Sequence, residues 1–197
     1  MRSPFQTPTP REQQRDETRA RLLAEAIAEF RREGFGRANV SRIAQRAGVS
    51  RASFYFHFPT KEHVLLELQW RLELRVVERL PSDASLRETL SELIEGLLES
   101  ESVVADSDLY RDMLGIYVRR PHDLPLAEQP FPLLFALGSR FAVAATRGEL
   151  RAGLEPAQAT HLFLTSLLGY LVGTDAPPDE RRAELEILVS LFLETRA

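Results

Sequence analysis

The segment from Asn39 to Phe58 holds polar side chains whose types and spacing could bind a nucleic acid. Arg51 and Ser53 follow Ser50, which can cap a helix, so both would lie on the exposed first turn of a short helix. A guanidinium can donate two hydrogen bonds to a guanine edge, and a serine hydroxyl can bond a base edge or a phosphate. This pattern predicts a helix that enters a major groove, with Arg51 as its main base contact.

The elements that must position these side chains are two short helices joined by a turn. Asn39 can cap the first helix, in which small apolar residues recur at intervals of three and four. Gly48 can end that helix, and Ser50 can begin a second one that we expect from Arg51 to about Phe58. These dimensions are typical of a helix-turn-helix.

Helical periodicity also dominates the rest of the chain, and no segment alternates convincingly with a period of two. Thr9 and Glu12 can form a capping box around Pro10, which predicts a first helix that ends at Gly34. We expect further helices at 61–80, 85–103, 106–119, 131–147, 156–173 and 179–195. The sequence therefore predicts an all-α fold, with a three-helix helix-turn-helix domain over 1–60 and a C-terminal helical bundle over 61–197.

Charge is distributed unevenly between the two parts of the chain. Residues 1–65 carry twelve Arg and Lys against seven acids, a net charge of +5, whereas the remainder carries 13 against 22, a net charge of −9. A basic N-terminal part can bind phosphates, and an acidic body would be repelled from them. Ordinary variation of surface charge is the alternative explanation.

The composition argues against several other classes of protein. The absence of cysteine excludes disulfides, thiolate zinc sites and cysteine nucleophiles. No 18 apolar residues run together and the first residues do not resemble a signal peptide, so we expect a cytoplasmic protein. The histidines at 57, 63, 122 and 161 show no metal-like pairing, and no nucleophile is paired with a base. We therefore expect no enzyme activity, no metal and no cofactor.

The order of residues in the N-terminal part resembles the DNA-binding signature of the TetR family of dimeric, ligand-responsive repressors. The matching runs are Gly34-Phe35, Val40 to Ser50, Ser53 to Phe58, and Lys61-Glu62. The resemblance is strong over residues 15–66; beyond them it rests on helix order and on phrases such as Arg147 to Arg151. It implies a homodimer that occupies a palindromic double-stranded DNA operator and is released when a small molecule binds the C-terminal bundle.

The resemblance adds further expected contacts to DNA. In the family's pattern, aromatic or histidine side chains at the positions of Tyr55 and His57 donate hydrogen bonds to phosphate oxygens, so the resemblance implies this role for both residues. Lys61 could hold a backbone phosphate at the start of the long helix, and the methyl group of Ala52 could touch a thymine methyl. Arg42 could reach a base or a phosphate, or could be a solvated arginine. The full expected set is Ser41, Arg42, Ser50, Arg51, Ala52, Ser53, Tyr55, His57 and Lys61.

The C-terminal bundle is where the resemblance implies a ligand pocket. Aromatic and methionine side chains at helical spacing could line it, although side chains in such a stripe more often belong to the core of a helical bundle. The candidates for ligand contact are Trp70, Tyr110, Met113, Tyr117, Phe135 and Phe141.

The helix expected over 156–173 is apolar all round, so it should be buried on more than one side. The simplest burial is a core on one face and a second subunit on the other, with Gly169 and Gly173 allowing close approach. A purely intramolecular core helix is the alternative. The residues expected at the dimer interface are Leu164, Leu167, Leu168, Leu171, Leu188, Leu191 and Phe192.

Two other functions stay open at this point. A protein of this kind could bind partners or organise the nucleoid, with DNA as a scaffold; dispersed binding sites would distinguish it from a promoter switch. An all-helical enzyme with an accidental helix-turn-helix is the other alternative, and the lack of spaced metal ligands or phosphate-cradling glycines disfavours it.

Overall fold

The computed structural model describes residues 9–104, 107–119 and 131–194, and over these residues the predicted all-α fold is confirmed. Within them it contains no β-strand, and one isolated antiparallel bridge joins Leu150 and Leu193. No helix of this part of the chain is long and apolar enough to cross a membrane. The helices are α1 (Pro10–Glu33), α2 (Val40–Arg46), α3 (Arg51–His57), α4 (Lys61–Arg79), α5 (Leu86–Val104), α6 (Ser107–Arg119), α7 (Pro132–Thr146), α8 (Pro156–Gly173) and α9 (Pro178–Ser190).

The chain divides into two compact units between Leu65 and Leu66. The sequence suggested a division after residue 60. In the structure, α4 begins in the first unit and continues into the second.

The helices of the first unit begin at the residues that cap chemistry predicts. Thr9 and Glu12 form the expected capping box, with the Thr9 amide donating to the Glu12 carboxylate over 2.8 Å. Asn39 Oδ1 accepts from the Ser41 amide at 2.8 Å, and Ser50 Oγ accepts from the Ser53 amide at 3.1 Å. These side chains therefore fix where α1, α2 and α3 start.

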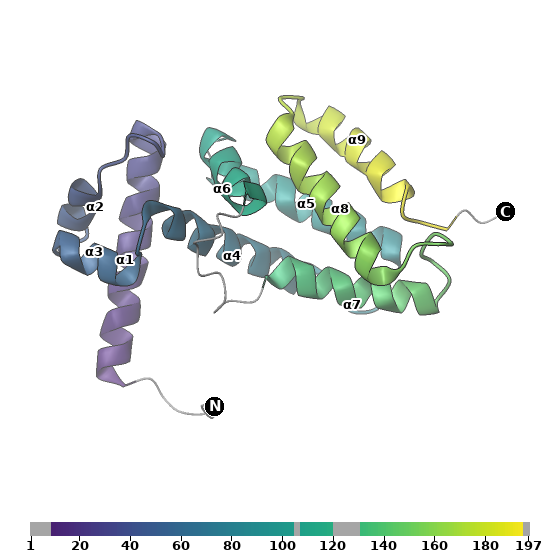
Figure 1. Ribbon diagram of the computed structural model, residues 1–197, viewed down its shortest axis with the longest axis horizontal. Helices are drawn as coiled ribbons and strands as arrows, with labels where there is room; N and C mark the ends of the chain where they lie inside the picture. The colour runs from purple at the N-terminus through teal and green to yellow at the C-terminus, as the bar shows by residue number, and fades with distance from the viewer. Residues whose placement is uncertain (1–8, 105–106, 120–130, 195–197) are drawn as a thin grey trace. The chain divides into compact units, whose positions relative to one another are not determined.

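A small apolar core holds α2 and α3 beside α1 (Figure 1). Ile43 of α2 and Phe54 of α3 are fully buried, together with Phe30 of α1 and Phe58. Gly48 turns the chain between α2 and α3 with a φ of +71°, a conformation that side-chain-bearing residues rarely adopt. Because these groups face inward, the opposite face of α3 is left open to solvent.

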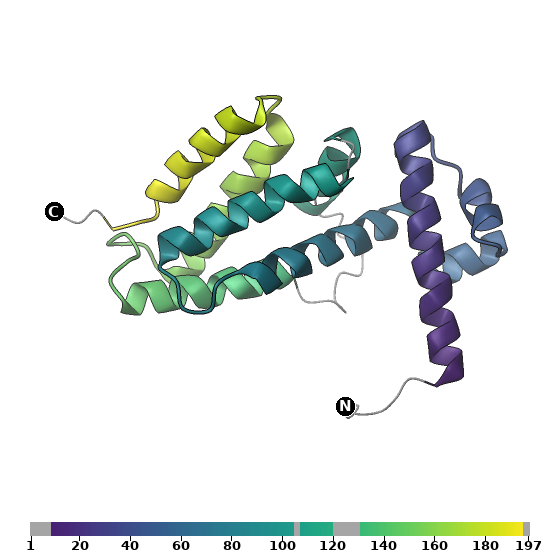
Figure 2. The same cartoon turned by 180° about the vertical axis from the view of Figure 1, so that it is seen from behind.

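The second unit is built around α5 and α8, which each contact several other helices (Figure 2). α8 packs against α6, α7 and α9, and α5 packs against α6, α7 and α9. Phe141 of α7, Phe163 of α8 and Phe192 form an aromatic cluster in the core, with ring centroids 5.3 to 6.1 Å apart. The core of the second unit is thus mainly apolar.

The last helix is shorter than predicted and ends at Ser190 instead of 195. The following residues leave the helix and pair with the turn between α7 and α8. The Arg151 amide donates to the Phe192 carbonyl at 3.0 Å, and the Glu194 amide donates to the Glu149 carbonyl at 2.8 Å. Long-range pairing, which helical periodicity cannot reveal, determines this end.

Candidate nucleic-acid interface

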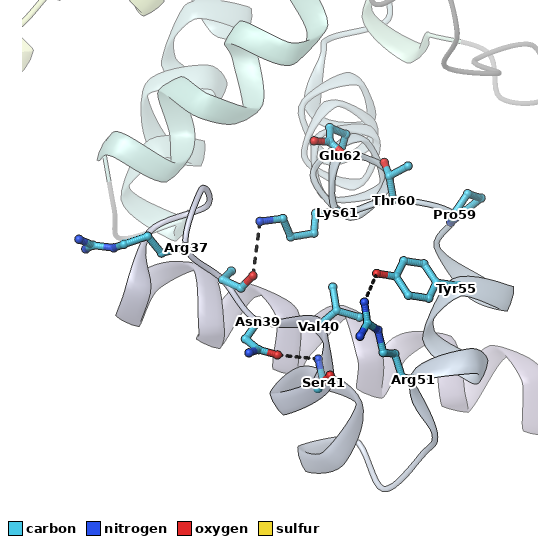
Figure 3. Close-up of a pocket in the computed structure, with 11 residues that line it drawn as sticks. Arg37, Asn39, Val40, Ser41, Arg51, Tyr55, Pro59, Thr60, Lys61 and Glu62 are labelled. Atoms are coloured by element: carbon cyan, nitrogen blue, oxygen red, sulfur yellow. Dashed lines mark hydrogen bonds between the residues drawn. The ribbon is translucent and has the colours of Figure 1, made fainter.

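The first unit carries an open groove beside the exposed face of α3, shown in Figure 3. Its lining comes from the loop before α2, from α2 and α3, and from the start of α4. The lining residues are Arg37, Ala38, Asn39, Val40, Ser41, Arg51, Tyr55, Pro59, Thr60, Lys61 and Glu62. The structure thus brings together four of the residues that the sequence predicts as DNA contacts: Ser41, Arg51, Tyr55 and Lys61.

Arg51 and Tyr55 lie one helical turn apart on the exposed face of α3. The Arg51 Nη2 donates to Tyr55 Oη at 3.4 Å, and the guanidinium carbon lies 5.6 Å from the Tyr55 ring centroid (Figure 3). Both side chains are exposed, as is Ala52, whereas Ser53 is half-buried. The tyrosine orients the guanidinium along the helix and leaves donors free for a partner.

Arg42, predicted to reach a base or a phosphate or to be solvated, pairs with a buried carboxylate in this structure. Its Nε lies 3.0 Å from Oε1 of Glu29, a carboxylate of α1 that is 0% exposed. The same Oε1 accepts from the Asn39 amide at 3.3 Å, and Arg32 also pairs with Glu29. Because the buried carboxylate needs these partners, Arg42 links α2 to α1, while 48% of its side chain stays exposed.

Lys61, predicted as a phosphate contact, binds backbone carbonyls within the first unit. Its Nζ donates to the carbonyls of Phe35 at 2.9 Å, Gly36 at 3.1 Å and Ala38 at 3.4 Å. An ammonium has three N–H donors, so these bonds use all of them. The charge also lies 5.1 Å from the Phe35 ring centroid. Lys61 therefore ties the start of α4 to the loop before α2.

His57, predicted as a phosphate contact, is buried, with 8% of its surface exposed. The reason is packing against α1, where Arg19 donates to the His57 carbonyl and lies 4.3 Å from the Phe58 ring centroid. Burial lowers the pKa of His57, and the charges of Arg19 and Arg15 lower it further. The neighbouring Phe56 is the exposed side chain of this turn, at 70%.

Seven of the eleven lining residues were not among the predicted contacts, and Arg37 and Thr60 are two of them that carry hydrogen-bond donors. Arg37 reaches the groove from the loop after α1, where its Nε donates to the Glu33 carbonyl at 3.0 Å. Thr60 stands at the start of α4, with its hydroxyl 3.0 Å from His63 Nδ1. The excess of basic residues in the N-terminal part is the available signal for Arg37, whereas the position of Thr60 directly before the long helix indicates a cap.

The residues predicted to contact a ligand are scattered over the second unit. Tyr110 and Met113 line a small interior cavity, Phe141 is in the aromatic cluster, and Phe135 is 68% exposed. Trp70 is half-buried. The side chain of Tyr117 lies outside the described part of the chain. The cavity also includes polar residues that the sequence analysis did not select: Gln69, Glu73 and Ser100.

Most residues predicted at the dimer interface are already buried within one chain. They fill the core between α8 and its neighbours, so they offer little surface to a partner; they are Leu164, Leu167, Leu168, Leu171 and Phe192. Leu188 is half-buried, and Leu191 is 52% exposed. Leu162 and Ile187, at 53% and 63%, are exposed apolar residues of α8 and α9 that the prediction omitted.

Among the described residues, no group of three or more His, Asp or Glu side chains could hold a metal ion. What the groove offers instead is an exposed guanidinium with hydroxyl and amide donors beside it. Such donors can bond phosphate oxygens and base edges.

Known proteins are similar in sequence to the part of the chain that carries the groove. Residues 22–68 match the family described as bacterial regulatory proteins, tetR family. The chain is 39% identical over 87 residues to the HTH-type transcriptional regulator YdgC of Bacillus subtilis, covering 44% of this chain and 40% of that protein. It is 40% identical over 73 residues to EthR of Mycolicibacterium smegmatis, covering 34% of each. The matches thus span less than half the length of these relatives.

Solved structures extend the similarity to both units. A TetR family regulator from Pseudomonas syringae is 29% identical, with a TM-score of 0.58 over 90% of this chain and 95% of that one. FadR of Thermus thermophilus, a TetR family repressor solved with lauroyl-CoA, shares the fold at 24% identity, with a TM-score of 0.65 over 88% and 92% of the two chains. By its helix-turn-helix sequence and its two-unit helical fold, the chain is similar to regulators of the TetR family.

Proposed function

We propose that this protein is a homodimeric, sequence-specific DNA-binding transcriptional regulator, and that it acts as a repressor released by a small molecule. The observation that carries the proposal is the exposed face of α3. Arg51 and Tyr55 lie on this face, on the side of the helix opposite the buried core, and they border a groove that is lined by hydrogen-bond donors. α3 would lie in the major groove, and Arg51 would donate to a guanine edge. The relatives that match this part of the chain are transcriptional regulators.

The groove would hold the DNA backbone that flanks this contact. Ser41, Arg37 and Thr60 present donors on its walls, and Tyr55 presents a hydroxyl. Contacts of this kind fix the register of a protein on the duplex, while base contacts provide specificity. We assign the DNA-binding role to the first unit and the ligand-binding and dimerisation roles to the second.

Dimerisation would use the outward faces of α8 and α9. Leu162, Ile187 and Leu191 are exposed there, and Gly169 and Gly173 of α8 have no other atom within 4 Å of an added Cβ. A partner helix could therefore approach the backbone closely. Two subunits related by a twofold axis would place two α3 helices about 34–36 Å apart, one helical turn of DNA.

Release by a ligand is supported by the fold and by relatives within it. FadR of Thermus thermophilus was solved with lauroyl-CoA, and RolR, which shares this fold with a TM-score of 0.64, was solved with resorcinol. A ligand would relieve repression to the extent that it prefers a dimer whose α3 helices no longer match successive major grooves.

The test is selection of bound fragments from genomic DNA by purified protein, followed by titration of the best site at several salt concentrations. We expect a short palindrome bound by one dimer in a few promoters. Binding that depends on salt but not on sequence, at many dispersed positions, would overturn the proposal and favour a nucleoid-organising protein.

A further inference from the structure

The second unit encloses a small cavity with a polar end formed by side chains from three helices. Gln69 and Glu73 come from α4, Ser100 from α5 and Tyr110 from α6. They are 4%, 4%, 6% and 2% exposed, respectively. The rest of the lining is apolar and includes Met113. As it stands, the cavity has room for about one water molecule.

Two of these side chains have already used their hydrogen-bond donors. Tyr110 Oη donates to the Leu97 carbonyl at 3.0 Å, and Ser100 Oγ donates to the Gly96 carbonyl at 2.7 Å. Burial raises the pKa of Tyr110, so its hydroxyl keeps its proton and that proton stays in the bond to Leu97. Both oxygens can still accept through their lone pairs.

The other two side chains also present acceptors. Gln69 Nε2 donates to Glu73 Oε1 at 2.9 Å, and the Leu133 amide donates to Glu73 Oε2 at 3.4 Å. Gln69 Oε1 is buried without a hydrogen-bond partner among the described residues. Buried amide oxygens without a partner are uncommon and destabilising, so such a group is usually bound by a water or a ligand.

We infer that this cavity is the polar end of a binding site for an apolar molecule that carries a hydrogen-bond donor, an ammonium or a hydroxyl group. The inference rests on the proposed ligand-responsive function and names the chemistry of the ligand. Its donor would meet Gln69 Oε1, the Glu73 carboxylate and the lone pairs of Tyr110 and Ser100. A carboxylate or phosphate would place further acceptors against the acceptors of Gln69, Tyr110 and Ser100.

The apolar part of the ligand needs more space than the cavity now has. Met113, unbranched and adaptable, stands with Leu114 and Leu168 on the apolar side of the cavity. Rotation of these side chains would open the site, and the free energy of opening lowers the affinity for small probes. Probes should therefore be tested up to millimolar concentration.

The test compares four probes of one skeleton on the full-length protein: benzylamine, benzyl alcohol, toluene and benzoate. Calorimetry and thermal unfolding give affinity and stabilisation. We expect benzylamine and benzyl alcohol to bind about tenfold more tightly than toluene, the value of one or two hydrogen bonds in a buried site. Benzoate should not bind measurably.

Two variants and one control assign the effect to the cavity. Gln69→Met should remove most of the preference for benzyl alcohol over toluene, and Glu73→Gln should weaken benzylamine more than benzyl alcohol. Gln158→Met, at an exposed position of α8, should leave all affinities unchanged. If a cavity variant fails to fold, the ranking of the probes on the unaltered protein still decides.

Three results would overturn the inference. They are tight binding of benzoate, binding of none of the probes, and an unchanged preference for benzylamine and benzyl alcohol over toluene in both cavity variants. Binding to the selected DNA site is measured separately by fluorescence anisotropy. If the protein did not bind DNA but ranked the probes as expected, the proposed function would be contradicted, while the inferred ligand chemistry of the cavity would still be supported.

Discussion

The helix-turn-helix unit and the helical body use their polar side chains differently. In the first unit, charged groups tie one element to another: Arg42 pairs with the buried Glu29, and Lys61 binds carbonyls of the loop before α2. In the second unit, ion pairs also join helices, but most lie at the surface of a mostly apolar core: Arg79–Glu92 is exposed, whereas Arg181–Glu101 is largely buried, at 11% and 13%. Near the proposed DNA-binding face, therefore, a basic residue can stabilise the fold as readily as it could bind DNA, and the sequence motif does not separate the two roles.

The largest effect is expected from a substitution in the buried core beneath α3. Phe54→Ala removes a fully buried ring from α3 and should lower the free energy of unfolding by about 3–5 kcal/mol. Phe56→Ala is the matched control, because the same ring two residues later is 70% exposed, and it should change stability by less than about 0.5 kcal/mol. Urea unfolding of the two variants measures both values. Equal losses would mean that Phe56 is also buried, for example against a partner.

The next comparison separates an arginine of the fold from an arginine of the interface. Arg51→Ala should cost about 1–3 kcal/mol of binding to the preferred site and relax discrimination at one base pair, with stability unchanged. Arg42→Ala should instead lower the free energy of unfolding by about 1–3 kcal/mol, because the buried Glu29 loses a partner. Binding to a panel of single-base variants of the site, together with urea unfolding, distinguishes the two.

Arg42→Ala with Glu29→Gln completes a double-mutant cycle for the pair. The double variant should be more stable than the sum of the single losses predicts, because the neutral amide no longer needs the guanidinium. If Arg42→Ala relaxed base discrimination and left stability unchanged, Arg42 would be a base contact as the sequence first suggested.

The start of each helix in the first unit was predictable because the determinants are local. Thr9, Asn39 and Ser50 cap helices with their own side chains, and each bond spans two or three residues. The end of α9 was not predictable in this way, since it depends on pairing with residues around Arg151. Propensity and periodicity contain no information on that contact.

The candidate site was predicted in part for the same reason. Arg51 and Tyr55 are exposed because the apolar spacing of α3 turns their face outward, and that spacing is visible in the sequence. The burial of His57 depends on α1, which is far away along the chain. Gln69 and Glu73 could have been found as polar residues four apart on the face of α4 that carries Leu72 and other buried apolar side chains.

Lys61 offers a smaller effect that sharpens the same comparison. Lys61→Met keeps the length of the side chain and removes the three bonds to carbonyls, so it should lower the free energy of unfolding by about 1–2 kcal/mol. A lysine bound to phosphate contributes about 0.9 to the slope of log affinity against log salt concentration. We expect this slope to be unchanged in the variant; a decrease of that size would assign the ammonium to DNA.

The smallest effect expected is on the pH dependence of stability. Burial and the charges of Arg19 and Arg15 lower the pKa of His57, so the folded state resists a proton that the unfolded chain accepts below about pH 6.5. The unfolded state then binds more protons, and stability must fall as pH decreases through this range. The pKa of His63 is also lowered, chiefly by burial. Its contribution to the pH dependence of stability is present both in the unaltered protein and in His57→Gln, so it cancels in the comparison.

Urea unfolding at pH 7.5, 6.5 and 5.5 should therefore show a steeper loss of stability toward low pH in the unaltered protein than in His57→Gln. If His57 instead pointed outward to bind a phosphate, its pKa would be near the ordinary value in the free protein. The slopes of the two proteins would then coincide, and the assignment of His57 to the packing of α3 on α1 would fail.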